Sequence, residues 1–92
     1  MKRLRWTPAA AADLEHIRNY LDRNHPHLAQ RTIVEIYERI KSLKHFPQVG
    51  RKGGEEGTRE LVMQSMPYII VFRERQQAIE ILRIWHTAQQ RH

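Results

Sequence analysis

The segment from Pro67 to His86 constrains the fold more than any other part of this 92-residue chain. Two runs rich in β-branched and aromatic residues, Tyr68 to Phe72 and Ile79 to Trp85, flank the polar residues 73–77. Such side chains fit a pleated, partly buried surface. The polar break contains no glycine, so we expect a loop longer than a two-residue primed turn. The segment therefore predicts an antiparallel β-hairpin that the other elements must cover or extend.

Local signals predict the remaining elements. Residues 2–6 alternate between faces and predict a short strand. Thr7 followed by Pro8 is typical of a helix start, and the apolar spacing predicts a helix from Pro8 to Arg23. A second amphipathic helix is expected from Pro26 to His45. Residues 48–57 hold all four glycines and predict a loop, and residues 58–64 alternate as a further strand.

The expected order is β-α-α-β-β-β, in a single domain that covers residues 1–92. This order predicts an α+β two-layer sandwich in which an antiparallel sheet packs against a helix hairpin. The first strand has no early neighbour, so we expect it to pair with a late strand. Strict alternation along the last strand would place Trp85 on one face with Ile79, Ile81 and Arg83.

The charge of the chain indicates the kind of partner. The formal net charge is +6, which favours an acidic partner such as a nucleic acid, a ribosome or an acidic protein. A merely soluble surface is the alternative. The absence of cysteine predicts a reducing, cytoplasmic location, and no apolar run approaches the ~20 residues of a membrane helix.

A series of motifs runs along nearly the whole chain: Thr7-Pro8, Phe46-Pro47 with Gly50-Arg51, Thr58-Arg59-Glu60-Leu61, Tyr68 to Phe72, and Ile79 to His86. In this order and spacing, these motifs resemble those of the ParE/RelE superfamily of toxins from bacterial toxin–antitoxin modules. The resemblance implies a RelE/ParE-like fold and an antitoxin that wraps the toxin. It also implies one of two activities, because ParE-like members poison DNA gyrase and RelE-like members cleave mRNA on the ribosome.

The resemblance favours gyrase inhibition over mRNA cleavage. RelE-like nucleases carry lysines on the strand at 58–64 and an arginine directly after the tyrosine of the next strand. This chain has Glu60 and Val62 on that strand and Ile69 after Tyr68. If the chain were a nuclease after all, Arg59, Arg83 and His86 would be its catalytic set, with His86 as the acid or base. A non-toxic or decayed binding module is a further alternative.

Two sets of residues are the candidate sites. The target-binding residues are expected to be Arg59, Arg83, Trp85, His86 and Arg91. The antitoxin-binding residues are expected to be Leu14, Ile17, Leu21, Ile33 and Tyr37. Three of the target-binding residues also have a purely structural interpretation. Arg83 could form an ion pair with Glu60 or Glu80, Trp85 could lie at the rim of the core, and His86 could be exposed or capped.

The expected partners follow from the same resemblance. A cognate antitoxin that is small, acidic and partly disordered would bind the groove between the helices or a sheet edge. The target would be DNA gyrase or, in the alternative, the ribosome with its mRNA. We expect no cofactor, no metal site and no membrane contact, and oligomerisation mainly through the antitoxin complex. The histidines at 16, 25, 27 and 45 lack the spacing and the companion ligands of a metal site.

Overall fold

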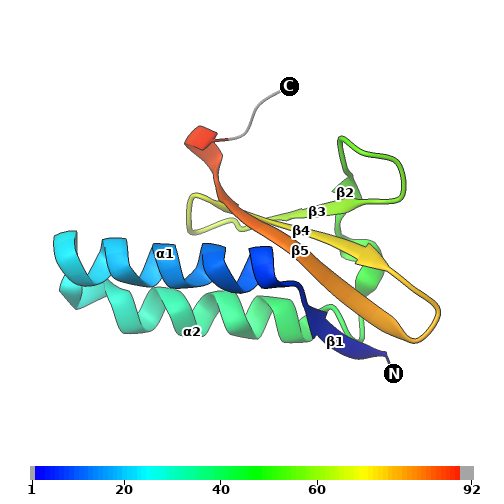
Figure 1. Cartoon of the computed structure of the whole chain (residues 1–92), viewed down its shortest axis with the longest axis horizontal. Coiled ribbons are helices and arrows are strands. Elements are labelled where there is room, and N and C mark those ends of the chain that lie inside the picture. Colours follow the sequence, from blue (N-terminus) through cyan, green and yellow to red (C-terminus); the bar gives the residue numbers. More distant parts are fainter. Residues whose placement is uncertain (1, 90–92) are drawn as a thin grey trace.

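A computed structural model describes residues 2–89 and shows a two-layer α+β fold (Figure 1). One layer is a five-stranded sheet in the order β1-β5-β4-β3-β2, and the other is a pair of α-helices. The elements are β1 (Arg3–Trp6), α1 (Pro8–Asn24), α2 (Pro26–Ser42), the 3₁₀ turn η1 (Pro47–Val49), β2 (Arg51–Lys52), β3 (Arg59–Val62), β4 (Tyr68–Glu74), β5 (Ala78–His86) and η2 (Thr87–Gln89). The α+β sandwich with its helix hairpin is thus confirmed.

The start of α1 forms as the sequence predicts. Thr7 has extended backbone angles, and its side-chain oxygen accepts a hydrogen bond from the backbone N–H of Ala10 at 3.1 Å. Pro8 occupies the first turn, where a helix leaves backbone N–H groups without internal partners. The Thr7 hydroxyl also donates to the carbonyl oxygen of Ile81 at 2.8 Å. One side chain therefore caps α1 and ties it to β5.

The sheet differs from the prediction in two respects. It is mixed rather than antiparallel throughout, because β1 pairs with β5 in parallel, with Leu4 opposite Ile79 and Trp6 opposite Ile81. The first strand does pair with a late strand, and the connection that runs through both helices makes the parallel direction possible. The predicted glycine-rich loop also contains a short strand, β2, in which Arg51 pairs with Glu60.

The second helix is shorter than predicted. It ends at Ser42, and residues 43–45 form turns instead of continuing to His45. Leu43 nevertheless remains fully buried, so the apolar periodicity extends past the end of the helix. The hairpin loop is longer than a two-residue turn, as predicted, although it is shorter than the polar break at 73–77, since β4 ends at Glu74 and β5 begins at Ala78.

The core lies between the helices and one face of the sheet. Side chains from α2 and from the central strands have essentially no exposure, and they include Ile36, Ile40, Ile70, Phe72, Ile79 and Ile81. Burying an aliphatic or aromatic side chain of this size contributes about 1.5–3 kcal/mol. The central pair, β4 and β5, is therefore the structural anchor that the sequence indicates.

A β-bulge in the hairpin changes the direction of the side chains at the end of β5. Val71 lies opposite Arg83, but the next residue, Phe72, lies opposite Ile81, so Leu82 is an extra residue on β5. Ile79 and Ile81 face the helices before the bulge. Beyond it, Ile84 faces the helices and Trp85 turns to the opposite face of the sheet. The prediction that Trp85 and Arg83 share a face with Ile79 and Ile81 is therefore wrong.

Candidate functional site

The face of the sheet that points away from the helices contains a broad concavity, which we call the outer bowl. Both α-helices lie on the opposite side of the sheet (Figure 1). The bowl has a volume of about 1030 Å³. Its lining combines cations, apolar side chains and the backbone of the glycine loop: Arg51, Lys52, Gly53, Gly54, Glu55, Thr58, Glu60, Val71, Arg73, Leu82, Arg83 and Trp85. Cations outnumber carboxylates in this lining, so the bowl suits an anionic or acidic partner.

One row of residues crosses the floor of the bowl. Strand pairing places Arg51 opposite Glu60, Glu60 opposite Val71 and Val71 opposite Arg83. Glu60 is buried, and its carboxylate accepts hydrogen bonds from the Arg51 guanidinium at 2.8 and 3.1 Å. The two ends of the row are cationic and its middle is apolar or charge-neutralised.

Arg83 is held at the wall of the bowl by a residue from α1. Its guanidinium donates to both carboxylate oxygens of Asp13, at 2.7 and 3.0 Å. These hydrogen bonds raise the pKa of Arg83 above its usual value. The predicted ion pair of Arg83 with Glu60 or Glu80 is wrong. Glu60 binds Arg51 and Glu80 binds Arg5 and Arg75, whereas the bulge brings Arg83 to Asp13.

Trp85 completes this wall of the bowl. The centre of the Arg83 guanidinium lies 5.6 Å from the centroid of the Trp85 ring, within the range of a cation–π contact. Trp85 is half-buried, so part of its ring remains available to a partner. Arginine and tryptophan are both among the residue types that are enriched at the hot spots of protein interfaces.

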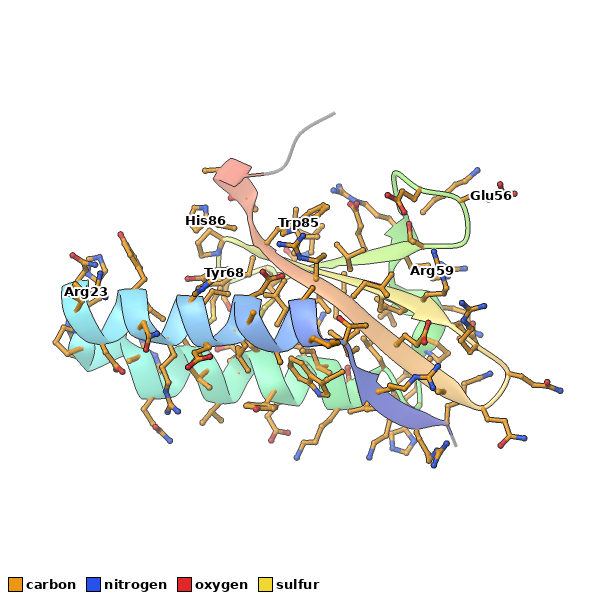
Figure 2. All side chains as sticks on the ribbon, in the orientation of Figure 1. Arg23, Glu56, Arg59, Tyr68, Trp85 and His86 are labelled. Carbon is orange, nitrogen blue, oxygen red and sulfur yellow. The ribbon has the colours of Figure 1, made fainter. Side chains whose placement is uncertain are left out.

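The other predicted target-binding residues lie elsewhere. His86 packs on the helix side, edge-on to Tyr68 at 5.6 Å, and its Nδ1 accepts a hydrogen bond from the Ala88 N–H at 3.0 Å. Arg59 pairs with Phe72 and donates to the Gly50 carbonyl at 2.7 Å. Figure 2 shows Arg59 and His86 towards opposite ends of the sheet. The structure thus does not bring the suggested nuclease set together, and the predicted Arg91 lies outside the described residues.

The predicted antitoxin-binding residues divide between the core and two smaller hollows. Leu14 and Ile33 are buried and line a groove of about 430 Å³ beside Tyr37, whose exposure is 45%. Ile17 lines a separate hollow of about 380 Å³ between α1 and the end of β5, and Leu21 is buried. Trp6 also lines the groove and contacts Tyr37, with 5.6 Å between ring centroids. The antitoxin set remains a prediction, to which the geometry adds Trp6.

Several residues of these sites were not foreseen from the sequence. The outer bowl adds Arg51, Arg73 and Leu82, and Asp13 acts from another layer of the fold. Asp13 was recognised as part of the Asp13-Leu14 motif, but Arg83, which Asp13 binds, lies 70 positions further along the chain. Among residues 2–89, no cluster of three or more His, Cys, Asp or Glu side chains could hold a metal ion. Nor is any helix in that range long and apolar enough to cross a membrane.

Burial affects the chemistry of one further residue. Desolvation raises the pKa of Tyr68, with a smaller contribution from Tyr20. A tyrosine with a raised pKa is a poorer proton donor near neutral pH. Tyr68 lies edge-on to His86, with 5.6 Å between the ring centroids.

Comparison with known proteins identifies the family. The model of the family described as "ParE toxin of type II toxin-antitoxin system, parDE" matches residues 4–91. The toxin-like protein Y4kP of Sinorhizobium fredii (strain NBRC 101917 / NGR234) is 38% identical over 89 residues, which is 97% of this chain and 92% of that protein. Toxin RelE2 of Caulobacter vibrioides is 35% identical over 88 residues, or 96% and 98% of the two chains.

Solved structures agree with this result. A chain of the chromosomal ParDE toxin–antitoxin system from P. aeruginosa superposes with a TM-score of 0.83 at 34% identity, and covers 94% of this chain and 96% of its own. The YoeB dimer from Staphylococcus aureus has a TM-score of 0.60 at 16% identity over 92% and 97% of the two chains, a likeness of fold alone. The chain described here therefore belongs to the ParE family of toxins from type II toxin–antitoxin systems.

Proposed function

We propose that this toxin inhibits DNA gyrase and is neutralised by a cognate antitoxin. We favour gyrase over the ribosome because of the residues that this chain has at the sheet positions where RelE-like nucleases have cations. In this chain Ile69 is only 2% exposed and Glu60 is buried and bonded to Arg51, and Val62 lies on the same face opposite Ile69. A buried aliphatic side chain cannot stabilise a phosphate or transfer a proton.

The outer bowl is the surface that we propose contacts gyrase. Arg83 and Trp85 stand together at its wall, and both retain exposed area for a partner. Figure 2 shows Trp85 well separated from Arg23, which lies at the far end of α1. Arg23 is therefore a suitable control site on the same molecule. Gyrase acts on the chromosome, so this function places the toxin in the cytoplasm.

The antitoxin is proposed to bind the other side of the molecule. The groove beside Tyr37 lies between the helices and next to β1, an edge strand of the sheet. An amphipathic helix in the groove and a strand added at the edge are two established ways in which a flexible segment binds. An acidic, partly disordered antitoxin would associate quickly with a chain of net charge +6. We propose that the toxin oligomerises mainly through this complex.

Ribosome-dependent mRNA cleavage is the second candidate. It is favoured by the cations of the outer bowl, Arg51, Lys52, Arg73 and Arg83, which could hold a phosphate backbone beside Trp85. It is also favoured by the 35% identity with a relative named Toxin RelE2. The bowl would then need a group that transfers protons, and His86 lies on the opposite face of the sheet.

Two assays run side by side distinguish the candidates. The purified toxin is titrated into a gyrase supercoiling reaction and into a cell-free translation reaction in which mRNA ends are mapped. We expect supercoiling to stop, or cleaved DNA to accumulate, while translation continues. Cuts in mRNA at ribosome-positioned codons, with supercoiling unaffected by excess toxin, would overturn the gyrase proposal in favour of the nuclease. Normal growth on induction without an antitoxin would instead favour a non-toxic binding module.

The same assay tests the proposed contact surface. Arg83→Ala should raise the toxin concentration needed for half-inhibition by about tenfold or more, because an interfacial hot spot contributes about 2 kcal/mol. Arg23→Ala should leave it unchanged. Both variants should still bind the antitoxin, since the groove beside Tyr37 does not include either residue. An Arg83→Ala variant that is folded and fully inhibitory would exclude the bowl wall as the contact.

A further inference from the structure

Among the residues that the structure describes, no strand pairs with the end of β5 on one side, and α1 takes that place. β1 stops at Trp6, opposite Ile81, whereas β5 continues to His86. Beyond Trp6, the Thr7 N–H and hydroxyl both donate to the Ile81 carbonyl, at 3.1 and 2.8 Å. The start of α1 thus continues the edge that β1 began.

Asp13 takes the next position along this edge. Its Oδ2 accepts a hydrogen bond from the backbone N–H of Ile84 at 2.9 Å. The same carboxylate binds the Arg83 guanidinium through both of its oxygens. One side chain therefore accepts three hydrogen bonds from two consecutive residues of β5, and its own exposure is only 13%.

The geometry restricts Arg83 more than an ordinary surface ion pair would. A bidentate contact fixes the plane of the guanidinium as well as its position. The Ile84 hydrogen bond anchors the carboxylate to the backbone beside Arg83, so the acceptor cannot follow the arginine if it moves. Arg83 still has 45% of its side chain exposed, and its guanidinium faces the Trp85 ring. The arginine is thus orientated without being hidden from a partner.

We propose that Asp13 is a positioning residue for target binding, which holds Arg83 beside Trp85 at the wall of the outer bowl. It contacts no target itself and acts through Arg83. The inference rests on the proposed function only in assigning Arg83 and Trp85 to the target contact. It adds that toxicity depends on a helix residue that lies outside the lining of the bowl.

Two consequences separate this role from a merely structural one. Asp13→Asn keeps one oxygen for the Ile84 N–H but loses the charge and the second acceptor for Arg83. We expect it to lower toxin potency about fivefold, since removing a partly exposed ion pair changes an equilibrium by up to about this factor. In an Arg83→Ala background the same change should have no further effect, because nothing then remains for Asp13 to position.

The test uses the full chain and four variants: Asp13→Asn, Arg83→Ala, the double variant, and Asp22→Asn as a control carboxylate on the exposed side of α1. Three quantities are measured for each: the toxin dose that arrests growth or inhibits gyrase, the affinity for the antitoxin, and the NMR signals of the Arg83 Nε–H and the Ile84 amide. For Asp13→Asn we expect unchanged antitoxin affinity and a protected Ile84 amide. The Arg83 Nε–H should exchange rapidly with solvent.

The outcomes decide the proposal independently of the target. Wild-type toxin that arrests growth without inhibiting gyrase overturns the gyrase assignment, and the growth dose then tests Asp13. The proposal is overturned if the Asp13→Asn variant is as potent as the wild type. It is also overturned if Asp13→Asn lowers potency by the same factor in the Arg83→Ala background as in the wild-type background. A parallel loss of antitoxin affinity would show general damage to the fold and would also overturn it. A wild-type chain that affects neither gyrase nor growth overturns both proposals.

Discussion

Replacing Thr7 by alanine should destabilise the protein through two lost hydrogen bonds of one hydroxyl. The Thr7 oxygen accepts from the Ala10 N–H at 3.1 Å and donates its proton to the Ile81 carbonyl at 2.8 Å, with the Leu82 carbonyl at 3.2 Å as a second, weaker acceptor of the same proton. Loss of an N-cap costs about 1 kcal/mol. Loss of the second hydrogen bond costs about 1 kcal/mol more, which is the typical net contribution of an intramolecular hydrogen bond. The backbone hydrogen bond from the Thr7 N–H to Ile81 is retained.

The expected total is therefore about 2 kcal/mol of unfolding free energy. For a domain of this size, that loss corresponds to a melting temperature about 8–16 °C lower. Urea unfolding followed by circular dichroism gives the free energy, and a thermal scan gives the melting temperature. Thr7→Ser keeps the hydroxyl and should lie within about 0.5 kcal/mol of the wild type.

Thr87→Ala provides the control, because Thr87 is exposed and its backbone N–H keeps its hydrogen bond to Pro67. It should change the free energy of unfolding by less than about 0.5 kcal/mol. If Thr7→Ala costs no more than this control, or Thr7→Ser costs as much as Thr7→Ala, the hydroxyl does not join α1 to β5 as argued. The edge of β5 would then depend on other contacts.

Two further changes test the glycine loop and the pH dependence of stability. Gly53→Ala would place a Cβ atom 2.2 Å from the Thr58 hydroxyl and should cost about 1–3 kcal/mol in urea unfolding, whereas Gly54→Ala meets nothing within 4 Å and should be near neutral. Hydrogen bonds from Arg5, the larger cause, and from a second arginine lower the pKa of Glu80 from 4.5, so the native state favours its ionised form. This contribution to the free energy of unfolding is present above the unfolded-state pKa and is lost as pH falls through the folded-state pKa. Glu80→Gln should therefore flatten the acid side of a curve of stability against pH. A slope equal to that of the wild type would contradict the assignment to Glu80.

The helices and most of the strands could be predicted from local signals, because each signal affects only the backbone conformation of adjacent residues. Thr7 and Pro8 start α1 as expected, and the β-branched run from Tyr68 to Phe72 lies within β4. The late pairing of the first strand also followed from topology. The direction of that pairing and the strand β2 did not follow, because strand pairing depends on contacts between distant segments.

The candidate site was harder to predict because one inserted residue changes its geometry. A period of two assigns faces correctly along β5 only as far as Ile81. The bulge at Leu82 could not be predicted, because the residues of β5 at the bulge have the same composition and strand propensity as those of a regular strand. The partner of Arg83 could not be inferred either, since Asp13 comes from a different layer of the fold.

The bulge also explains how one strand can contribute both to the core and to a binding surface. Without it, the apolar positions Ile79, Ile81 and Trp85 would all fall on the helix side, and Arg83 would enter the core with them. With it, Ile84 continues the core while Arg83 and Trp85 emerge on the outer face. Register shifts of this kind locally weaken strand pairing. The hydrogen bonds from α1 to this stretch of β5 offset that weakness where the toxin is proposed to meet its target.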